Sequence, residues 1–512
     1  MNAPVGRDVL ARNTAWAVFG YFVSFGIPVL MTPYVVSKLG LPQYGVWVAL
    51  SVLASWLGRF DLGIWSALAR EVSERRARGD AEGLRTLGAT WLLYDLLISS
   101  ALCAAAVLAA PPLLRLFAID PSVAGPSLWA LMTIQAALSS VMRHFTYTLN
   151  GLQRVDRSQQ VGLIAAPFWA AGMAAVLELG MGLTGLALNN VLFALLQIGV
   201  LAVLLRREGC PIALLPRSFR GRDLRGLLST GLKLEVAGVL GAVLRSDRLA
   251  LGPLGFPPAS VALYQIGSTV ADRLGAGVIT LSSAVLPAAS DLAARGERER
   301  LRTLLHRSTK YHALAATGLL GFAALFAPEL LLLWMGRPLP DSAAILRIMS
   351  LGAWACTVCA PAQALAVALG RPGLATLAAA SALGGGLLLY MAGGRSYDEP
   401  GLAGAVSGGL LLSQVLFMIG FRGSLEFRWR EFVGNALLKP LAAGLPPAAV
   451  YAGWRLLSPQ VPVADGRLSA LLVLAPAFLA AAALSWAAAR ATGALDAYDM
   501  DLLKSLGRRA PA

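Results

Sequence analysis

Several ionisable side chains lie inside segments that are otherwise apolar enough to leave water. The stretch SWLGRFDLGIW, residues 55–65, places Arg59 and Asp61 two residues apart within one such segment. An arginine or aspartate at the centre of a membrane helix costs about 2.5–3.5 kcal/mol on insertion scales. Residues of this kind therefore pair with one another, lie near an interface, or line a wet cavity where they hold ions or charged ligands.

The helices predicted below contain twelve such residues, seven basic and five acidic. Facing lipid, they would together cost about 30 kcal/mol on the same scale, more than the whole stability of a fold. The basic residues are Arg59, Arg143, Lys233, Arg245, Arg248, Arg273 and Arg347, and the acidic residues are Asp61, Asp95, Glu235, Asp247 and Asp272.

Helical periodicity gathers some of these residues into polar stripes. In the predicted helix 126–149, polar residues recur at steps of four, four, four and three, which places them on one face. They are Gln135, Ser139, Arg143, Tyr147 and Asn150. We expect this stripe to line an aqueous lumen and to contact a polar substrate.

Two other predicted helices place arginines on one face without a complete polar stripe. Arg245 and Arg248 are three residues apart in the predicted helix 229–252, so they share a face. Arg59 lies on a serine-lined face of its helix, whereas Asp61 points about 160° away from it. We expect the arginines to face the lumen.

The acidic residues leave alternatives open. Asp61 forms a local ion pair, ends a helical segment before Gly63, or binds a coupling ion. The choice between ion pairing and ion coupling also applies to Asp95, Asp247 and Asp272. Three other charged residues lie near helix ends, where long side chains reach the interface: Lys233, Glu235 and Arg347.

The composition predicts the elements that position these residues. Of 512 residues, 57% are hydrophobic and only 14% are charged, against about 25% charged in a soluble domain. Apolar runs long enough to span a bilayer recur along the chain. We predict an all-α integral membrane protein with fourteen helices: 14–36, 43–68, 88–111, 126–149, 160–178, 184–205, 229–252, 259–289, 311–333, 342–368, 374–392, 402–420, 436–454 and 468–489.

Lysine and arginine in the loops set the orientation. With the N-terminus in the cytoplasm, the inside segments hold 30 of these residues and the outside loops hold 6. Both termini are therefore predicted to be cytoplasmic. The net charge of +15 is mostly this orientation signal, and no basic soluble face remains to bind nucleic acid.

The two halves of the chain resemble each other at one constant offset in the numbering. LRTL at 84–87 returns at 301–304, ARGD at 77–80 returns as ARGE at 294–297, and APPLLRLF at 110–117 returns as APELLLLW at 327–334. A repeat of six helices gives both copies the same orientation, a transporter design with the site between the halves. We predict bundles at 1–210 and 211–425, with 426–512 adding two helices and a cytoplasmic tail.

The sequence lacks the residue patterns of several kinds of site. Cys356 and Cys359 form a C-x-x-C without the further ligands of a zinc site, so we interpret them as packed helix residues. No G-x-x-x-x-G-K-[ST] loop occurs, and the predicted outer loops are too short for a catalytic domain. We expect no cofactor, no metal and no enzymatic activity, although a membrane glycosyltransferase, polymerase or ligase is a rival class.

Residues in both copies resemble one family, the bacterial polysaccharide (O-antigen and exopolysaccharide) flippases. These belong to the multidrug, oligosaccharidyl-lipid and polysaccharide exporter superfamily. The matching residues of the first copy are Pro33, Leu39-Gly40 with Tyr44-Gly45, and Asp61-Leu62-Gly63. Those of the second copy are Asp247, Leu251-Gly252 and Tyr264.

The resemblance implies two six-helix bundles around a V-shaped cavity and transport by alternating access. The substrate would be an oligosaccharide on a polyprenyl diphosphate, moved from the cytoplasmic to the outer leaflet of the bacterial inner membrane. Arginine can hold a diphosphate bidentately. The expected headgroup contacts are Arg143, Arg245, Arg248 and Arg273, with Arg59 less strongly indicated.

The resemblance also leaves alternatives within the superfamily. A peptidoglycan-precursor flippase and a cation-coupled multidrug exporter share the fold. The mildly basic balance of charges within the helices favours an anionic substrate, because drug-exporting relatives rely more on acidic cavities. Besides the lipid-linked oligosaccharide, we expect membrane lipids and other polysaccharide-assembly membrane proteins as partners of a monomer.

Overall fold

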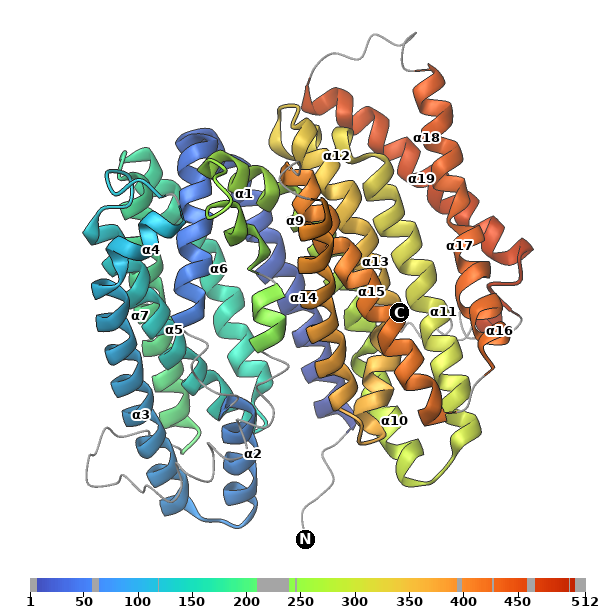
Figure 1. Ribbon diagram of the computed structural model, residues 1–512. Helices are drawn as coiled ribbons and strands as arrows, with labels where there is room; N and C mark the ends of the chain where they lie inside the picture. The colour runs from blue at the N-terminus through green and yellow to red at the C-terminus, as the bar shows by residue number, and fades with distance from the viewer. Residues whose placement is uncertain are drawn as a thin grey trace. The chain divides into compact units, whose positions relative to one another are not determined.

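The computed structural model describes residues 7–57, 64–117, 119–209, 239–244, 246–393, 398–425, 428–457, 466–496 and 498–501 (Figure 1). Over these residues the chain is helical and contains no strand. It divides into two compact units, Met1–Ala262 and Leu263–Ala512. The division at residues 210 and 425 drawn from the sequence stays a prediction.

The first unit is built mainly of long helices. Its elements are α1 (Arg7–Leu57), α2 (Ile64–Ala77), α3 (Ala81–Leu108), α4 (Ala110–Leu116), α5 (Pro126–Gly151), α6 (Val155–Glu178), α7 (Gly182–Arg207) and the 3₁₀ turn η2 (Asp247–Leu251). Helix α5 packs between α3 and α7, and α6 packs against α1 and α7 (Figure 1).

The second unit follows the same plan and adds C-terminal helices. Its elements are α9 (Pro258–Ile279), η3 (Thr280–Ala284), α10 (Val285–Ala294), α11 (Arg298–Leu325), α12 (Ala327–Met335), α13 (Pro340–Ala368), α14 (Gly373–Gly393), α15 (Glu399–Leu425), α16 (Trp429–Phe432), the π-helical segment η5 (Val433–Leu438), α17 (Lys439–Ala443), α18 (Leu445–Leu457) and α19 (Arg467–Ala491). Helix α9 begins in the last residues of the first unit.

The internal repeat is visible in the helix boundaries. Helices α3 and α11 both have 28 residues, and their first residues, Ala81 and Arg298, are related by the offset of the sequence repeat. The same offset relates the start of α7 to that of α15 and the end of α5 to that of α13. Both α3 and α11 follow a glycine with a positive φ, Gly79 at 70° and Gly296 at 71°. The sequence repeat is therefore a repeat of local structure.

Proline divides one predicted helix and marks the end of another. The predicted helix 311–333 divides into α11 and α12 before Pro328, whereas the predicted helix 88–111 ends close to the end of α3, where α4 starts with Pro111 and Pro112. Helices α11 and α12 meet at 76°. Proline lacks an N–H and disfavours the helical conformation of the residue before it, so a new helix starts there. These breaks fall in the APPLLRLF and APELLLLW segments of the repeat.

The turn predicted between the first two helices lies within α1. Gly40 has a φ of 76° and a ψ of 167°, which is not helical, so two helices meet at this residue. Glycine adopts this left-handed region without a steric penalty. The predicted Leu39-Gly40 turn is thus a sharp break in the helix.

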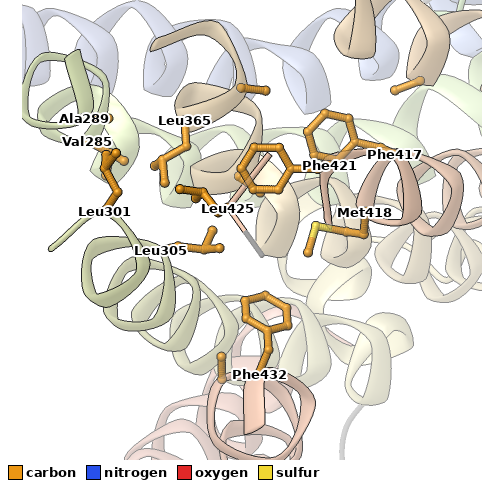
Figure 2. Packing of buried hydrophobic residues seen from close by; sticks show 14 residues of the cluster. Val285, Ala289, Leu301, Leu305, Leu365, Phe417, Met418, Phe421, Leu425 and Phe432 are labelled. Carbon is orange, nitrogen blue, oxygen red and sulfur yellow. The ribbon is translucent and has the colours of Figure 1, made fainter. Parts of the chain in front are cut away.

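An apolar cluster fixes the C-terminal helices to the second unit. Figure 2 shows Leu305 of α11, Leu425 of α15 and Phe432 of α16 in one cluster, all nearly fully buried. Helices α17 and α18 also pack against α11, and α19 packs against α12 and α18 (Figure 1). The chain after residue 425 is therefore joined to the bundle by side-chain packing.

Length and composition identify membrane spans among the described helices. Eight are long and apolar enough to cross a bilayer, and nine qualify when the bent α11–α12 pair is counted as one. Large apolar side chains such as Leu388 of α14 and Leu472 of α19 are two-thirds exposed. Exposed apolar surface of this extent is expected where lipid replaces water.

Close approach of α14 and α15 depends on glycine, and this yields a stability prediction. A Cβ on Gly409 would overlap the Ala382 carbonyl oxygen and lie 2.6 Å from the Gly386 nitrogen, both backbone atoms that cannot rotate away. Gly409→Ala should lower the free energy of unfolding by about 1–3 kcal/mol. A Cβ on Gly404 in the same helix would meet no atom within 4 Å, so Gly404→Ala is the matched control.

The measurement is unfolding of the purified full-length protein in detergent. Gly404→Ala should leave stability unchanged or raise it, because alanine is favoured over glycine in helices by about 0.5–1 kcal/mol. Equal stability of the two variants would contradict the role assigned to Gly409.

Candidate functional site

The polar stripe predicted on α5 lies along the edge of the buried face of that helix. Gln135 Nε2 donates a hydrogen bond to Ser139 Oγ at 3.0 Å, and Ser139 Oγ donates to the Gln135 carbonyl oxygen at 2.9 Å. Near the other end, Asn150 Oδ1 accepts a hydrogen bond from Ser158 of α6 at 2.9 Å. All five stripe residues are half-buried, so part of each side chain stays accessible.

Arg143 and Tyr147 have different surroundings within the stripe. Tyr147 packs at the margin of the apolar cluster that contains Phe145 and Leu149. Arg143 instead interacts electrostatically with Asp95 of α3. The stripe therefore combines a charged centre with one aromatic residue that also serves the packing.

Asp95 is held in a buried polar cluster between α3 and α5. Its side chain is 5% exposed, and its Oδ1 accepts hydrogen bonds from Ser140 at 2.7 Å and from Ser99 at 3.5 Å. Its Oδ2 is buried and has no hydrogen-bond partner among the described residues. The structure thus brings together two predicted site residues, Asp95 and Arg143, from helices that the sequence treated separately.

Asp247 and Arg248 lie in η2 and interact with each other. The backbone N–H of Arg248 donates a hydrogen bond to Asp247 Oδ1 at 2.9 Å, and the side-chain Nε of Arg248 lies 3.7 Å from the same oxygen. Both side chains are nearly buried, and Arg248 also interacts electrostatically with Tyr44 of α1. Residues 239–244 are helical, but the turn at Ser246 and the 3₁₀ geometry of η2 mean that Arg248 does not continue that α-helix.

A second polar stripe lies on α9. Gln265 Nε2 donates a hydrogen bond to Thr269 Oγ1 at 2.7 Å, and Asp272 and Arg273 follow one turn later with exposed side chains. Asp272 also interacts electrostatically with the Cys356 thiol of α13. The sequence predicted Asp272 and Arg273 but missed Gln265 and Thr269, although the four-residue spacing that identified the α5 stripe occurs here too.

Other buried polar contacts were not predicted. His312 of α11 lies 2.8 Å from Ser282 Oγ and from the Ser308 carbonyl oxygen, and Gln363 donates to Gln414 at 3.0 Å between α13 and α15. Cys103, Cys356 and Cys359 are free thiols. Among the residues that the structure describes, no group of three His, Cys, Asp or Glu side chains could hold a metal ion.

Three predicted site residues, Arg59, Asp61 and Arg245, lie outside the described residues. The described part of the predicted site therefore consists of the α5 stripe with Asp95, the Asp247–Arg248 pair in η2, and the α9 stripe with Asp272 and Arg273.

Solved structures resemble this chain, although no protein-family model and no curated protein matches it. The lipid II flippase MurJ in an inward closed conformation matches with a TM-score of 0.68 and 13% identity, over 93% of this chain and 98% of that one. A multidrug resistance MATE family transporter of the MOP superfamily, facing inward, matches with a TM-score of 0.62 and 16% identity, over 81% and 94%. A mutant of the Vibrio cholerae MATE transporter VcmN matches with a TM-score of 0.58 and 15% identity, over 83% and 98%.

The chain has the fold of the MOP-superfamily transporters. This confirms the all-α membrane fold predicted from the sequence, and the family resemblance stays a prediction. The similar structures are transporters and flippases rather than enzymes. The protein is therefore a multi-pass membrane protein of transporter fold.

The two serines that bond Asp95 Oδ1 yield a paired prediction. Ser140→Ala removes the 2.7 Å hydrogen bond to a buried carboxyl group and should destabilise the protein by about 1–3 kcal/mol. Ser99→Ala removes only the 3.5 Å contact and should have a smaller effect.

Detergent unfolding of both variants in wild-type and Asp95→Asn backgrounds tests this difference. The cost of Ser140→Ala should change in the Asp95→Asn background because the two side chains interact directly. Strict additivity of Ser140→Ala and Asp95→Asn would show that this hydrogen bond contributes nothing.

Proposed function

We propose that the protein is a flippase that moves a polyprenyl-diphosphate-linked oligosaccharide from the cytoplasmic to the outer leaflet, for the synthesis of O-antigen or exopolysaccharide. The observation that carries this proposal is Arg143, a half-buried cation in the middle of the polar stripe on α5, in a chain with an exporter fold. Alternating access would expose the stripe to each side of the membrane in turn.

The charge of the substrate explains the intramembrane arginines. A diphosphate is anionic, and guanidinium groups bind such groups through paired, charge-assisted hydrogen bonds. Arg143, Arg248 and Arg273 are the described candidates for these contacts, and Arg59 and Arg245 are further candidates. Part of this positive charge is balanced within the protein, because Arg143 interacts with Asp95 and Arg248 with Asp247.

The remaining polar groups suit sugars. Gln135, Ser139 and Asn150 present amide and hydroxyl groups along the same half-buried face as Arg143. These groups both donate and accept hydrogen bonds, as sugar hydroxyls require. The polyprenyl chain needs no polar site and would stay in lipid.

The similar solved structures include both a lipid II flippase and a multidrug resistance MATE family transporter. The lipid II flippase matches over 93% of this chain, and the two MATE transporters match over 81% and 83%. Their identities to this chain are only 13%, 16% and 15%, so the likeness supports the fold, and the substrate is argued from the charges.

We further propose Asp95 as the group that couples transport to an ion gradient. Arg143 compensates the charge of Asp95. A diphosphate bound to Arg143 would withdraw that compensation, and the unpaired Oδ2 of Asp95 would then bind a proton or another cation. Substrate and coupling ion would in this way be linked through one arginine.

Deletion of the gene tests the substrate. The deletion strain should retain lipid-linked oligosaccharide on the cytoplasmic leaflet and lose its surface polysaccharide, while peptidoglycan synthesis continues. Accumulation of peptidoglycan precursor with cell lysis would instead identify a peptidoglycan-precursor flippase. Intact surface polysaccharide with increased drug sensitivity would identify a cation-coupled multidrug exporter.

Substitution of Arg143 tests the headgroup contact. Arg143→Ala should weaken binding of the diphosphate lipid by about tenfold to a hundredfold, the loss of one charge-assisted contact, while Arg143→Lys should retain part of it. Arg70→Ala is the control, because Arg70 is three-quarters exposed and pairs with Glu74 on the surface of the same unit.

Export in the complemented deletion strain and lipid binding to the purified protein are the two measurements. Membrane insertion of Arg143→Ala is checked by its abundance in the membrane fraction. Wild-type export by Arg143→Ala would remove this residue from the proposed site.

A further inference from the structure

A polar cavity outside the predicted site lies at one end of the second unit. It has a volume of about 660 Å³ and is bounded by α11, α16, η5, α17 and the turn after α19. Six of the side chains that line it are basic or imidazole groups: Arg302, His306, Arg307, Lys310, Arg428 and Lys439. A volume of this size holds a small ligand or a lipid headgroup.

Three segments that are distant in the sequence form this cavity. Its lining residues fall within 290–310, 421–439 and 490–512, which are three of the segments that the charge distribution assigns to the cytoplasmic side. Five of the basic residues that predict the orientation of the chain therefore line one cavity. If the basic loop residues served only to orient the chain in the membrane, they would not need to lie close together.

Apolar and ionic contacts fix the walls. The ring of Phe432 of α16 lies edge-on to the ring of His306, with 5.3 Å between their centroids. Phe432 is also buried in the cluster with Leu301 and Leu305 (Figure 2). Lys310 Nζ lies 2.6 Å from Asp499 Oδ2, and the Tyr311 hydroxyl donates to the same carboxylate. Although burial by itself raises the pKa of Asp499, the hydrogen bonds from Lys310 and Tyr311 lower it below its ordinary value, so this anchor is ionised at neutral pH.

Some of the lining cations already have carboxylate partners. Arg302 Nη1 lies 2.5 Å from Glu299 Oε1, and Arg428 Nη1 lies 3.2 Å from Glu431 Oε1. Lys310 Nζ lies 3.4 Å from Asp496 Oδ2, in addition to its contact with Asp499. These pairs account for the three carboxylates that line the cavity.

Two lining cations differ from the others. Arg307 stacks its guanidinium over the Tyr498 ring at 3.7 Å, and Lys439 lies near Gly493 at the end of α19. Neither has a carboxylate within 4 Å in the described part of the chain. The cavity therefore has positive charge in excess, from side chains held on two different elements.

Two exposed leucines lie near the cavity-lining Lys439 in the sequence. Leu438, which precedes Lys439, is 58% exposed, and Leu445 at the start of α18 is 66% exposed. A ligand that places an anion in the cavity and hydrocarbon along these leucines would satisfy both surfaces. Anionic phospholipids have this construction, and basic pockets between helices on the cytoplasmic side suit their headgroups.

We propose that this cavity binds a phosphate group, with Arg307 and Lys439 as the contacts and an anionic membrane lipid as its source. Bound there, the phosphate bridges α11 to α17 and the segment after α19. No residue of the α5 or α9 stripe lines this cavity, so it is a second ligand site, independent of which substrate is transported.

Binding of phosphatidylglycerol to the full-length protein tests the proposal. Native mass spectrometry and thermal unfolding are carried out in phosphatidylcholine nanodiscs with and without phosphatidylglycerol, and with inorganic phosphate added to pure phosphatidylcholine. Wild type should bind phosphatidylglycerol and unfold at a higher temperature. Arg307→Ala with Lys439→Ala should weaken this binding by about tenfold to a hundredfold.

Two further variants keep the test decisive. Asn435→Asp adds a carboxylate to the cavity lining with almost no change of shape and should also weaken binding. Arg300→Ala with Arg422→Ala removes two exposed cations from the same side, neither of which lines the cavity, and should bind like wild type.

Each outcome decides the proposal. Binding of phosphatidylglycerol that is lost in the cavity variants supports the lipid source, and a response to inorganic phosphate alone with the same losses supports the site with a soluble ligand. Binding that is equal in wild type and cavity variants, equal loss in the control pair, or no binding of either probe overturns it.

Discussion

An ionised group inside a membrane protein needs a compensating partner, and this requirement connects the parts of the structure. Asp95 is held by Ser140 and Arg143 between α3 and α5, and Lys310 is held by Asp499 between α11 and the C-terminal segment. Removing one partner of a buried pair costs about 3–5 kcal/mol because the other charge is left uncompensated. Polar contacts of this kind therefore fix which helices are neighbours, while apolar side chains fill the space between them.

Local sequence signals predicted much of the fold. The constant offset between the two halves appeared in three short matches, and the structure extends it to the equal lengths of α3 and α11. The helix break before Pro328 was missed because the apolar pattern runs through it. The contact between Lys310 and Asp499 was also missed, since the two residues are far apart in the sequence and neither has a distinctive local pattern. The spacing of residues in the sequence predicts which of them share a face of one helix. Which residues pair across helices depends on how the helices pack.

Fold and substrate specificity have different determinants in this molecule. The fold is shared with transporters at 13–16% identity, so it depends on the pattern of apolar residues and on small residues such as Gly409 more than on particular side chains. The helices contain few polar side chains, and these side chains supply the groups that can bind a substrate. The α5 stripe could be predicted from the sequence because four-residue spacing places residues on one face of a helix. Its association with Asp95 required the structure.

The repeat has a consequence for how the two halves diverged. Asp95 and His312 are related by the offset of the repeat, so they occupy equivalent positions in α3 and α11, and each is almost fully buried. Duplication supplied the same scaffold twice, and divergence left a carboxylic acid in one copy and an imidazole in the other. The equivalent positions of the repeat therefore hold different buried polar groups with different partners, Asp95 with Ser140 and His312 with Ser282.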